Sequence, residues 1–213
     1  MTRQMPLFPL GTVMFPGTAL PLHVFEPRYR ALMDDLTGGE LGTPLITPEF
    51  GIALIERGHE VGGGDQRARI GTVARLADAQ RLDDGRWVAL AGGVGRFRVE
   101  AFLPDDPYPM AMVEDLADEP WGVTPAEALA AAEAAVRRAL ALAIELEDGN
   151  GPVTFDLDDD PATAAWQLCG LAPLGDLDRQ RLLETGDHQA RLGLVRSLTA
   201  EVAEVLAQRL SGR

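Results

Sequence analysis

The chain has 213 residues and a formal net charge of −14, and all of its 19 basic side chains are arginines because it contains no lysine. So acidic a chain disfavours a nucleic-acid partner, because binding to phosphates relies on clustered cations. With Cys169 as the one cysteine and no run of 18 apolar residues, the sequence predicts no intramolecular disulfide and no membrane span. We therefore expect a cytoplasmic protein.

Two short apolar runs open the chain, at residues 7–10 and 13–15, and a proline or glycine closes each of them. Both runs are predicted strands. The prolines among them, and Pro21 after them, cannot occupy central positions of a hydrogen-bonded ladder, so we expect an edge strand or a bulged corner. Pro27 then favours the first turn of a helix over residues 28–36.

The next segment alternates turns and strands. Residues 37–49 are rich in glycine and proline and predict a loop, residues 50–56 predict a strand, and residues 62–65 predict a flexible turn. The Asp83-Asp84-Gly85 turn predicts a hairpin between strands at 70–82 and 86–90.

A glycine-rich stretch then leads into residues 96–99, which predict a strand with one buried face. On that strand Phe97 and Val99 are expected to point inward, and Arg96 and Arg98 outward.

The second half of the chain has helical spacing. After a boundary at residues 118–124, a capping box at Thr124 and Glu127 predicts a helix to about residue 146. Asp160 predicts the cap of a helix that stops at Gly170, and two more helices are predicted over residues 177–184 and 187–210. The last helix is expected to bury one stripe of side chains: Leu194, Val195, Leu198, Val202, Val205 and Leu206.

Several motifs together resemble one family. The opening P-L-F-P-L-x-x-V-x-F-P-G-x-x-L-P-L-x-V-F-E-P-R-Y-R is very similar to the start of the Lon protease N-terminal, or substrate-binding, domain family. The resemblance continues through F-G-I-A-L-I, G-x-E-V-G, I-G-T-V-A, G-x-x-R-F-R-V and P-Y-x-x-A-x-V-E to a late R-x-x-L-L-E and an R-L pair. It covers nearly the whole chain, which looks like a standalone bacterial-type member without ATPase or protease domains.

The resemblance implies an α+β fold, with a PUA-like mixed β-barrel domain at residues 1–120 followed by a four-helix bundle at residues 121–213. It also implies a noncatalytic module. A Walker A loop requires a lysine, as does the serine–lysine pair of Lon proteases, and this chain has no lysine and two serines, Ser197 and Ser211. We therefore predict no enzymatic activity and no cofactor.

Candidate metal sites are weakly supported. The three histidines are far apart in sequence and there is one cysteine, so no zinc site is predicted. Asp156, Asp158 and Asp160 imitate the start of a calcium loop, but Pro161 and Gln167 stand where glycine and glutamate are needed. The acidic doublets, such as Asp83-Asp84, are interpreted as turn and cap residues.

The candidate substrate-binding residues are aromatic and charged side chains of the opening motif and of the predicted strand at 96–99: Phe8, Phe15, Phe25, Glu26, Arg28, Tyr29, Arg96 and Phe97. An aromatic side chain exposed on a groove is a typical anchor for a peptide. The alternative is architectural, with Glu26 and Arg28 clamping a strand to a helix and the aromatic rings filling the core.

Three functions remain open at this stage. The first is recognition of unfolded or exposed segments of client proteins, which a separate protease or chaperone could receive. The second is a scaffold that docks one folded partner, and the third is small-molecule binding in a cleft between the domains. The sequence leaves the oligomeric state open.

Overall fold

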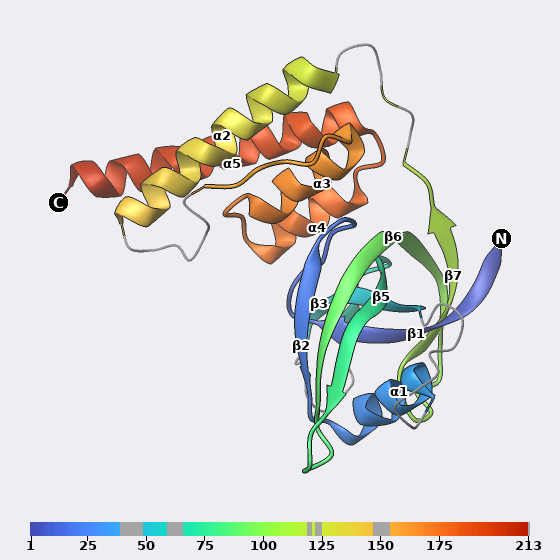
Figure 1. Ribbon diagram of the computed structural model, residues 1–213. Helices are drawn as coiled ribbons and strands as arrows, with labels where there is room; N and C mark the ends of the chain where they lie inside the picture. The colour runs from blue at the N-terminus through green and yellow to red at the C-terminus, as the bar shows by residue number, and fades with distance from the viewer. Residues whose placement is uncertain (39–48, 59–65, 119–120, 122–124, 147–153, 213) are drawn as a thin grey trace. The chain divides into compact units, whose positions relative to one another are not determined.

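The computed structural model describes residues 1–38, 49–58, 66–118, 121, 125–146 and 154–212 (Figure 1). The first of two units, Met1–Ala117, contains the strands and one helix. In chain order these are β1 (Thr2–Leu10), β2 (Ala19–Val24), α1 (Pro27–Thr37), β3 (Glu49–Arg57), β4 (Gln66–Arg67), β5 (Ile70–Arg81), β6 (Trp87–Leu103) and β7 (Met110–Leu116). The second unit, Asp118–Arg213, is helical. The structure is therefore a mixed α+β fold whose first unit is rich in sheet.

The strands of the first unit pair along a path that returns to its start. β1 pairs with β7, β7 with β6, β6 with β5 and β5 with β3, all antiparallel. β3 then pairs in parallel with the second half of β1, at Leu7–Leu10. Because residues 2–6 of β1 pair with β7 and residues 7–10 with β3, the strand changes neighbour at its middle. β2 pairs with β6 alone among the described strands.

The predicted strand at residues 13–15 is wrong. These residues are buried but have no strand pairing. Side-chain hydroxyls satisfy two of their carbonyl groups in place of a neighbouring strand, since Thr72 Oγ1 donates to the Met14 carbonyl at 2.6 Å and Thr18 Oγ1 to that of Phe15 at 2.7 Å. The second apolar run therefore packs in the core without joining a β-ladder.

The predicted hairpin is confirmed. β5 and β6 pair in antiparallel register, and Gly85 in the turn between them has φ 79°, a left-handed conformation that glycine adopts without strain. The expectation for Arg96 is wrong, because its side chain is buried at 3% exposure. Its neighbour Phe97 is also buried, and successive strand residues point to opposite faces, so this part of β6 is covered on both faces.

Helix α1 begins at the predicted proline and ends at Thr37, and its C-cap residue Gly38 has φ 80°. Its buried face, Tyr29, Leu32, Met33 and Leu36, belongs to an apolar cluster that also includes residues of β1, β2, β3, β5 and β6. A second cluster lies among the paired strands and contains Met5, Leu7, Ala53, Val73, Phe97, Val99, Ala111 and Val113. The first cluster fixes the strand-to-helix junction at residues 24–27.

The second unit contains α2 (Pro125–Glu145), α3 (Pro161–Leu171), α4 (Asp176–Glu184) and α5 (His188–Ser211). α2 packs on α5 and α3, and α5 also contacts α3 and α4. Asp160 caps α3 as predicted, since its carboxylate accepts a hydrogen bond from the Thr163 amide at 2.9 Å. The predicted stripe on α5 needs correction at Val205, which is 57% exposed. The helix buries Thr199 and Ala203 instead, so its packed face is rotated from the one expected.

Some predictions fall outside the described residues. They are most of the loop predicted at 37–49, the whole turn at 62–65, the capping threonine at 124 and the Gly-Asn-Gly-Pro stretch at 149–152, which is predicted to end the first C-terminal helix. Within the described residues, no helix is both long and apolar enough to cross a membrane.

Candidate functional site

A small pocket lies where the ends of β1 and β2 approach each other. Its volume is about 50 Å³, several times the roughly 10–15 Å³ that one water molecule needs. Phe8, Pro9 and Leu10 line it from β1, and the segment from His23 to Glu26 lines it from β2 and the following turn, together with Tyr29. A space of this size and lining accepts one apolar side chain.

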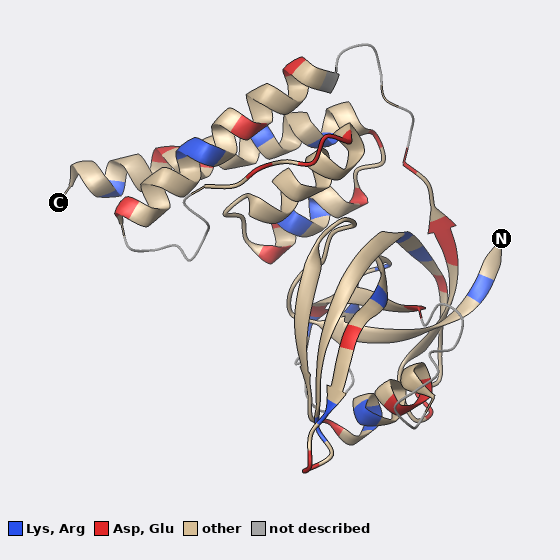
Figure 2. Cartoon of the chain, viewed as in Figure 1, with Lys and Arg blue, Asp and Glu red and all other residues tan. Residues whose placement is uncertain are grey.

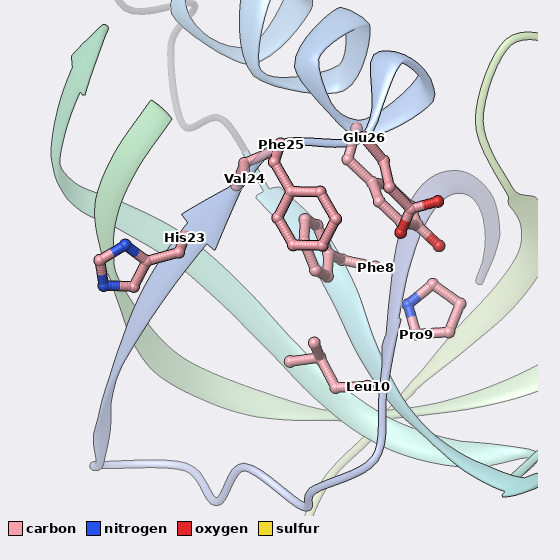
Figure 3. A pocket seen from close by; sticks show the side chains of 8 residues that line it. Phe8, Pro9, Leu10, His23, Val24, Phe25 and Glu26 are labelled. Atoms are coloured by element: carbon pink, nitrogen blue, oxygen red, sulfur yellow. The ribbon is translucent and has the colours of Figure 1, made fainter. Parts of the chain in front are cut away.

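Phe25 is the exposed aromatic residue of this pocket. Its side chain is 55% exposed, whereas Phe8 and Tyr29 are nearly fully buried. Figure 3 shows the rings of Phe8 and Phe25 facing the same space as Leu10, while the His23 ring points away. Phe25 therefore combines contact with the pocket and access to a partner.

Buried ring contacts support the floor of the pocket. The rings of Phe8 and Tyr29 are stacked with centroids 4.3 Å apart, and the Arg28 guanidinium lies 4.5 Å from the centroid of the Tyr29 ring. Arg28 Nε also donates to Glu26 Oε2 at 3.2 Å. Glu26 is the N-cap residue of α1, but its side chain makes no capping bond to the helix. The pair therefore joins the strand end to the helix start, as the architectural interpretation expects.

An ion-pair chain continues from this corner. Arg28 Nη1 lies 4.0 Å from Asp105 Oδ2, and Arg67 Nη2 lies 3.2 Å from the same oxygen. Asp105 belongs to the segment between β6 and β7, so the pocket corner is connected to a distant part of the chain. The opposite charges compensate one another beside the pocket.

The remaining predicted contact residues lie elsewhere. Phe15 and Phe97 are fully buried, and Arg96 is buried at 3% exposure. Phe97 belongs to the second apolar cluster, away from the pocket lining. Five of the eight candidate residues thus gather at one corner: Phe8, Phe25, Glu26, Arg28 and Tyr29.

The second unit contains a buried polar cluster that the sequence did not predict. Arg191 has no exposed surface, and its Nη2 donates to Asp118 Oδ1 at 2.9 Å and to the Thr185 carbonyl. Its guanidinium carbon lies 3.6 Å from the centroid of the Trp166 ring, and the Trp166 indole N–H donates to Asp118 Oδ2 at 3.1 Å. The one sequence signal was the R-L pair of the family resemblance, which is Arg191 and Leu192.

His188 completes this cluster. Arg191 Nη1 contacts His188 Nδ1 at 3.1 Å, and because a guanidinium can only donate, Nδ1 is the acceptor and the ring proton lies on Nε2. The histidine ring also stacks on the Trp121 ring, with the two centroids 4.4 Å apart. The cluster therefore fixes Asp118 and Trp121, at the start of the helical unit, against α3 and α5.

Chemically reactive groups are scarce. Among the described residues there is no group of three or more histidine, cysteine, aspartate or glutamate side chains placed to hold a metal ion. Cys169 is fully buried, and burial raises the pKa of its thiol to about 12. The thiolate that a nucleophilic cysteine needs is therefore suppressed at neutral pH.

Comparison with known proteins gives the family. A model of the ATP-dependent protease La (LON) substrate-binding domain matches residues 4–201. The chain belongs to this family. The Lon substrate-binding domain is noncatalytic, and the match covers most of the chain.

Relatives of this Lon substrate-binding domain agree with the assignment. Lon protease 2 of Sorangium cellulosum is 28% identical over 208 residues, which are 95% of this chain and 25% of that protein. The crystal structure of a Lon N-terminal domain protein from Xanthomonas campestris matches with a TM-score of 0.64 and 28% identity, covering 92% of this chain and 98% of that one.

The N-terminal domain of the Mycobacterium avium complex Lon protease matches at TM-score 0.60 and 22% identity, covering 93% and 99% of the two chains, and supports the fold alone. The chain spans about a quarter of the length of the S. cellulosum Lon protease.

Proposed function

We propose that this chain is a noncatalytic substrate-recognition module that binds unfolded or exposed segments of client proteins. The observation that carries the proposal is Phe25, an exposed aromatic side chain at the rim of an apolar pocket. Rigid aromatic residues beside apolar pockets are frequent anchors of binding energy. Membership of the Lon substrate-binding family supports the same class of ligand.

We also propose the finer architecture of the two units and the location of the protein in the cell. The closed path of strand pairing supports a PUA-like β-barrel, and the contacts among α2–α5 support a four-helix bundle. The proposed domain boundary remains near residue 120. The proposed location is the cytoplasm, where a separate protease or chaperone could receive the client.

The pocket's chemistry favours protein segments over small molecules. Small-molecule sites usually measure roughly 300–1,000 Å³, well above the volume of this pocket, and they contain several convergent polar groups. Here the nearby carboxylate of Glu26 is already paired with Arg28. A single apolar side chain of an extended or unfolded chain is the ligand that fits.

The test is binding of the purified protein to a labelled, permanently unfolded polypeptide and to the folded form of the same polypeptide, measured by fluorescence anisotropy at two salt concentrations. We expect selective binding of the unfolded form with little salt dependence, because the pocket is apolar. The substitution Phe25→Ala is expected to weaken binding about tenfold, as for a typical aromatic anchor.

Phe102→Ala is the matched control. Phe102 is also an exposed phenylalanine, at 40%, but it lies on β6 and does not line the pocket. Equal losses in both variants would contradict the proposed site. Absence of binding to either form of the polypeptide would contradict the proposed function and leave the scaffold for one folded partner as the interpretation to pursue.

A further inference from the structure

Strand β2 has one described neighbour, and its register shows which backbone groups face away from it. β2 pairs with β6 so that Ala19 lies opposite Gly92 and Val24 opposite Trp87, without a register shift. One step before the strand, the Gly93 amide donates to the Thr18 carbonyl at 2.9 Å. In an antiparallel pair, hydrogen-bonded and non-hydrogen-bonded residue pairs alternate. The N–H and C=O groups of residues 20, 22 and 24 therefore point toward β6.

The backbone groups of Ala19, Pro21 and His23 consequently point to the opposite edge. All three residues are exposed, and the described part of the chain offers no hydrogen-bond partner to them on that side. Pro21, which has no N–H, occupies one of these outward positions, where its missing donor costs no bond to β6. The free edge thus presents the N–H and C=O of Ala19 and His23 and the C=O of Pro21.

This edge lacks the charged residues that usually protect edge strands from pairing with another chain. Natural edge strands are commonly blocked by lysine or other charges, by proline or by bulges. β2 contains no arginine, aspartate or glutamate, and Figure 2 shows it without charged residues. Pro21 is its one protective residue. The edge is therefore open to another extended backbone.

The apolar pocket lies at the C-terminal end of the same strand. His23, Val24 and Phe25 line it, so a chain lying along β2 would bring one of its side chains to the pocket. We infer that β2 binds a client as an added strand, with main-chain hydrogen bonds to Ala19 and His23 and one apolar side chain in the pocket.

The occupant is an extended, proline-poor segment with one apolar anchor. Only an extended backbone has donors and acceptors at the spacing that a strand edge requires, because a helix uses its own internally. The pocket has room for one side chain, so one apolar residue of the client is the anchor. Main-chain pairing explains how one site accepts many sequences. The inference rests on the proposed function and adds the geometry of recognition.

The first test uses the full chain and two eight-residue peptides rich in threonine and serine, each with a single leucine that fixes the register. One peptide is N-methylated at its odd-numbered residues, and the other at its even-numbered residues. Strand addition predicts that one peptide binds like the unmethylated parent and the other binds at least tenfold more weakly. Equal binding, or equal loss, would overturn the inference.

The second test observes the protein. Amide hydrogen exchange at Ala19 and His23 should be fast in the free chain and slow at least fivefold when the parent peptide is bound, whereas Leu22 should be protected in both states. Ala19→Pro removes the edge-facing donor without removing a bond to β6, and we expect it to weaken peptide binding about fivefold. Ala19→Val keeps the donor and should bind within twofold of the unsubstituted chain.

The outcomes separate the two proposals. If the unfolded polypeptide binds but exchange at Ala19 and His23 does not slow, strand addition is wrong and the proposed function stands. If no polypeptide binds, the proposed function itself fails. Sedimentation of the free chain identifies a competing occupant, because a dimer with Ala19 and His23 already protected would place a second copy on the edge and overturn the inference.

Discussion

Tyr108 shows how one surface contact couples α1 to the strand region. Its hydroxyl donates to Asp35 Oδ2 at 2.7 Å, and desolvation together with that carboxylate raises its pKa to about 12 from the ordinary value of 10. The neutral phenol is therefore favoured in the folded state. Its contribution to stability is complete below pH 10 and is lost as the pH rises through 12.

As Tyr108 ionises between pH 10 and 12, the free energy of unfolding of the native chain should fall. We expect the variant Tyr108→Phe to lack this part of the fall, as measured by urea denaturation at each pH. Phenolate absorbance of the native chain should contain a transition near pH 12 that the variant lacks. Identical pH dependence in both proteins would contradict this assignment.

At the scale of elements, close packing of β3 against β5 requires glycine. A Cβ atom added at Gly71 would lie 2.4 Å from the Ile52 carbonyl oxygen and 2.5 Å from a ring carbon of Phe97. Neither neighbour is the free end of a flexible chain, since one is backbone and the other is a fully buried ring. The pairing of β3 with β5 therefore depends on the absence of a side chain at Gly71.

We predict that Gly71→Ala destabilises the fold by about 2–3 kcal/mol, the upper part of the range for overpacked cores. Urea denaturation followed by circular dichroism measures the change. Gly95→Ala is the control, because a Cβ at Gly95 on β6 meets no atom within 4 Å. A loss at Gly95 as large as that at Gly71 would rule out steric contact as the cause.

At the scale of the whole molecule, we expect the buried cluster of the second unit to control access to Cys169. Arg191 and Cys169 are both fully buried in that unit. Removing Arg191 leaves the Asp118 carboxylate without its strongest partner, which for a buried ion pair costs about 3 kcal/mol. Labelling of Cys169 then reports how often the unit opens.

Arg191→Met is expected to accelerate thiol labelling at pH 8 about a hundredfold, since 1.4 kcal/mol corresponds to a factor of ten. The native chain should label slowly, because the pKa of its buried thiol is about 12. Arg196→Met provides the comparison, as Arg196 is an exposed arginine on the same helix. Fast labelling of the native chain would show that the cluster does not control access.

The sequence by itself determined the local structure and the family. Pro27 and Asp160 marked helix starts, and the Asp83-Asp84-Gly85 turn marked the hairpin, because caps and tight turns depend on residues that are neighbours in the chain. The opening motif identified the Lon substrate-binding family for the same reason: it is a continuous stretch.

The tertiary structure decided which side chains are buried, because burial depends on what packs from distant parts of the chain. It placed Arg96 inside, left residues 13–15 without a ladder, and separated exposed Phe25 from the buried rings of Phe8 and Phe15. It also joined Asp118 to Arg191, two residues 73 positions apart that no local pattern connects. The free edge of β2 likewise follows from strand pairing, which sequence spacing does not encode.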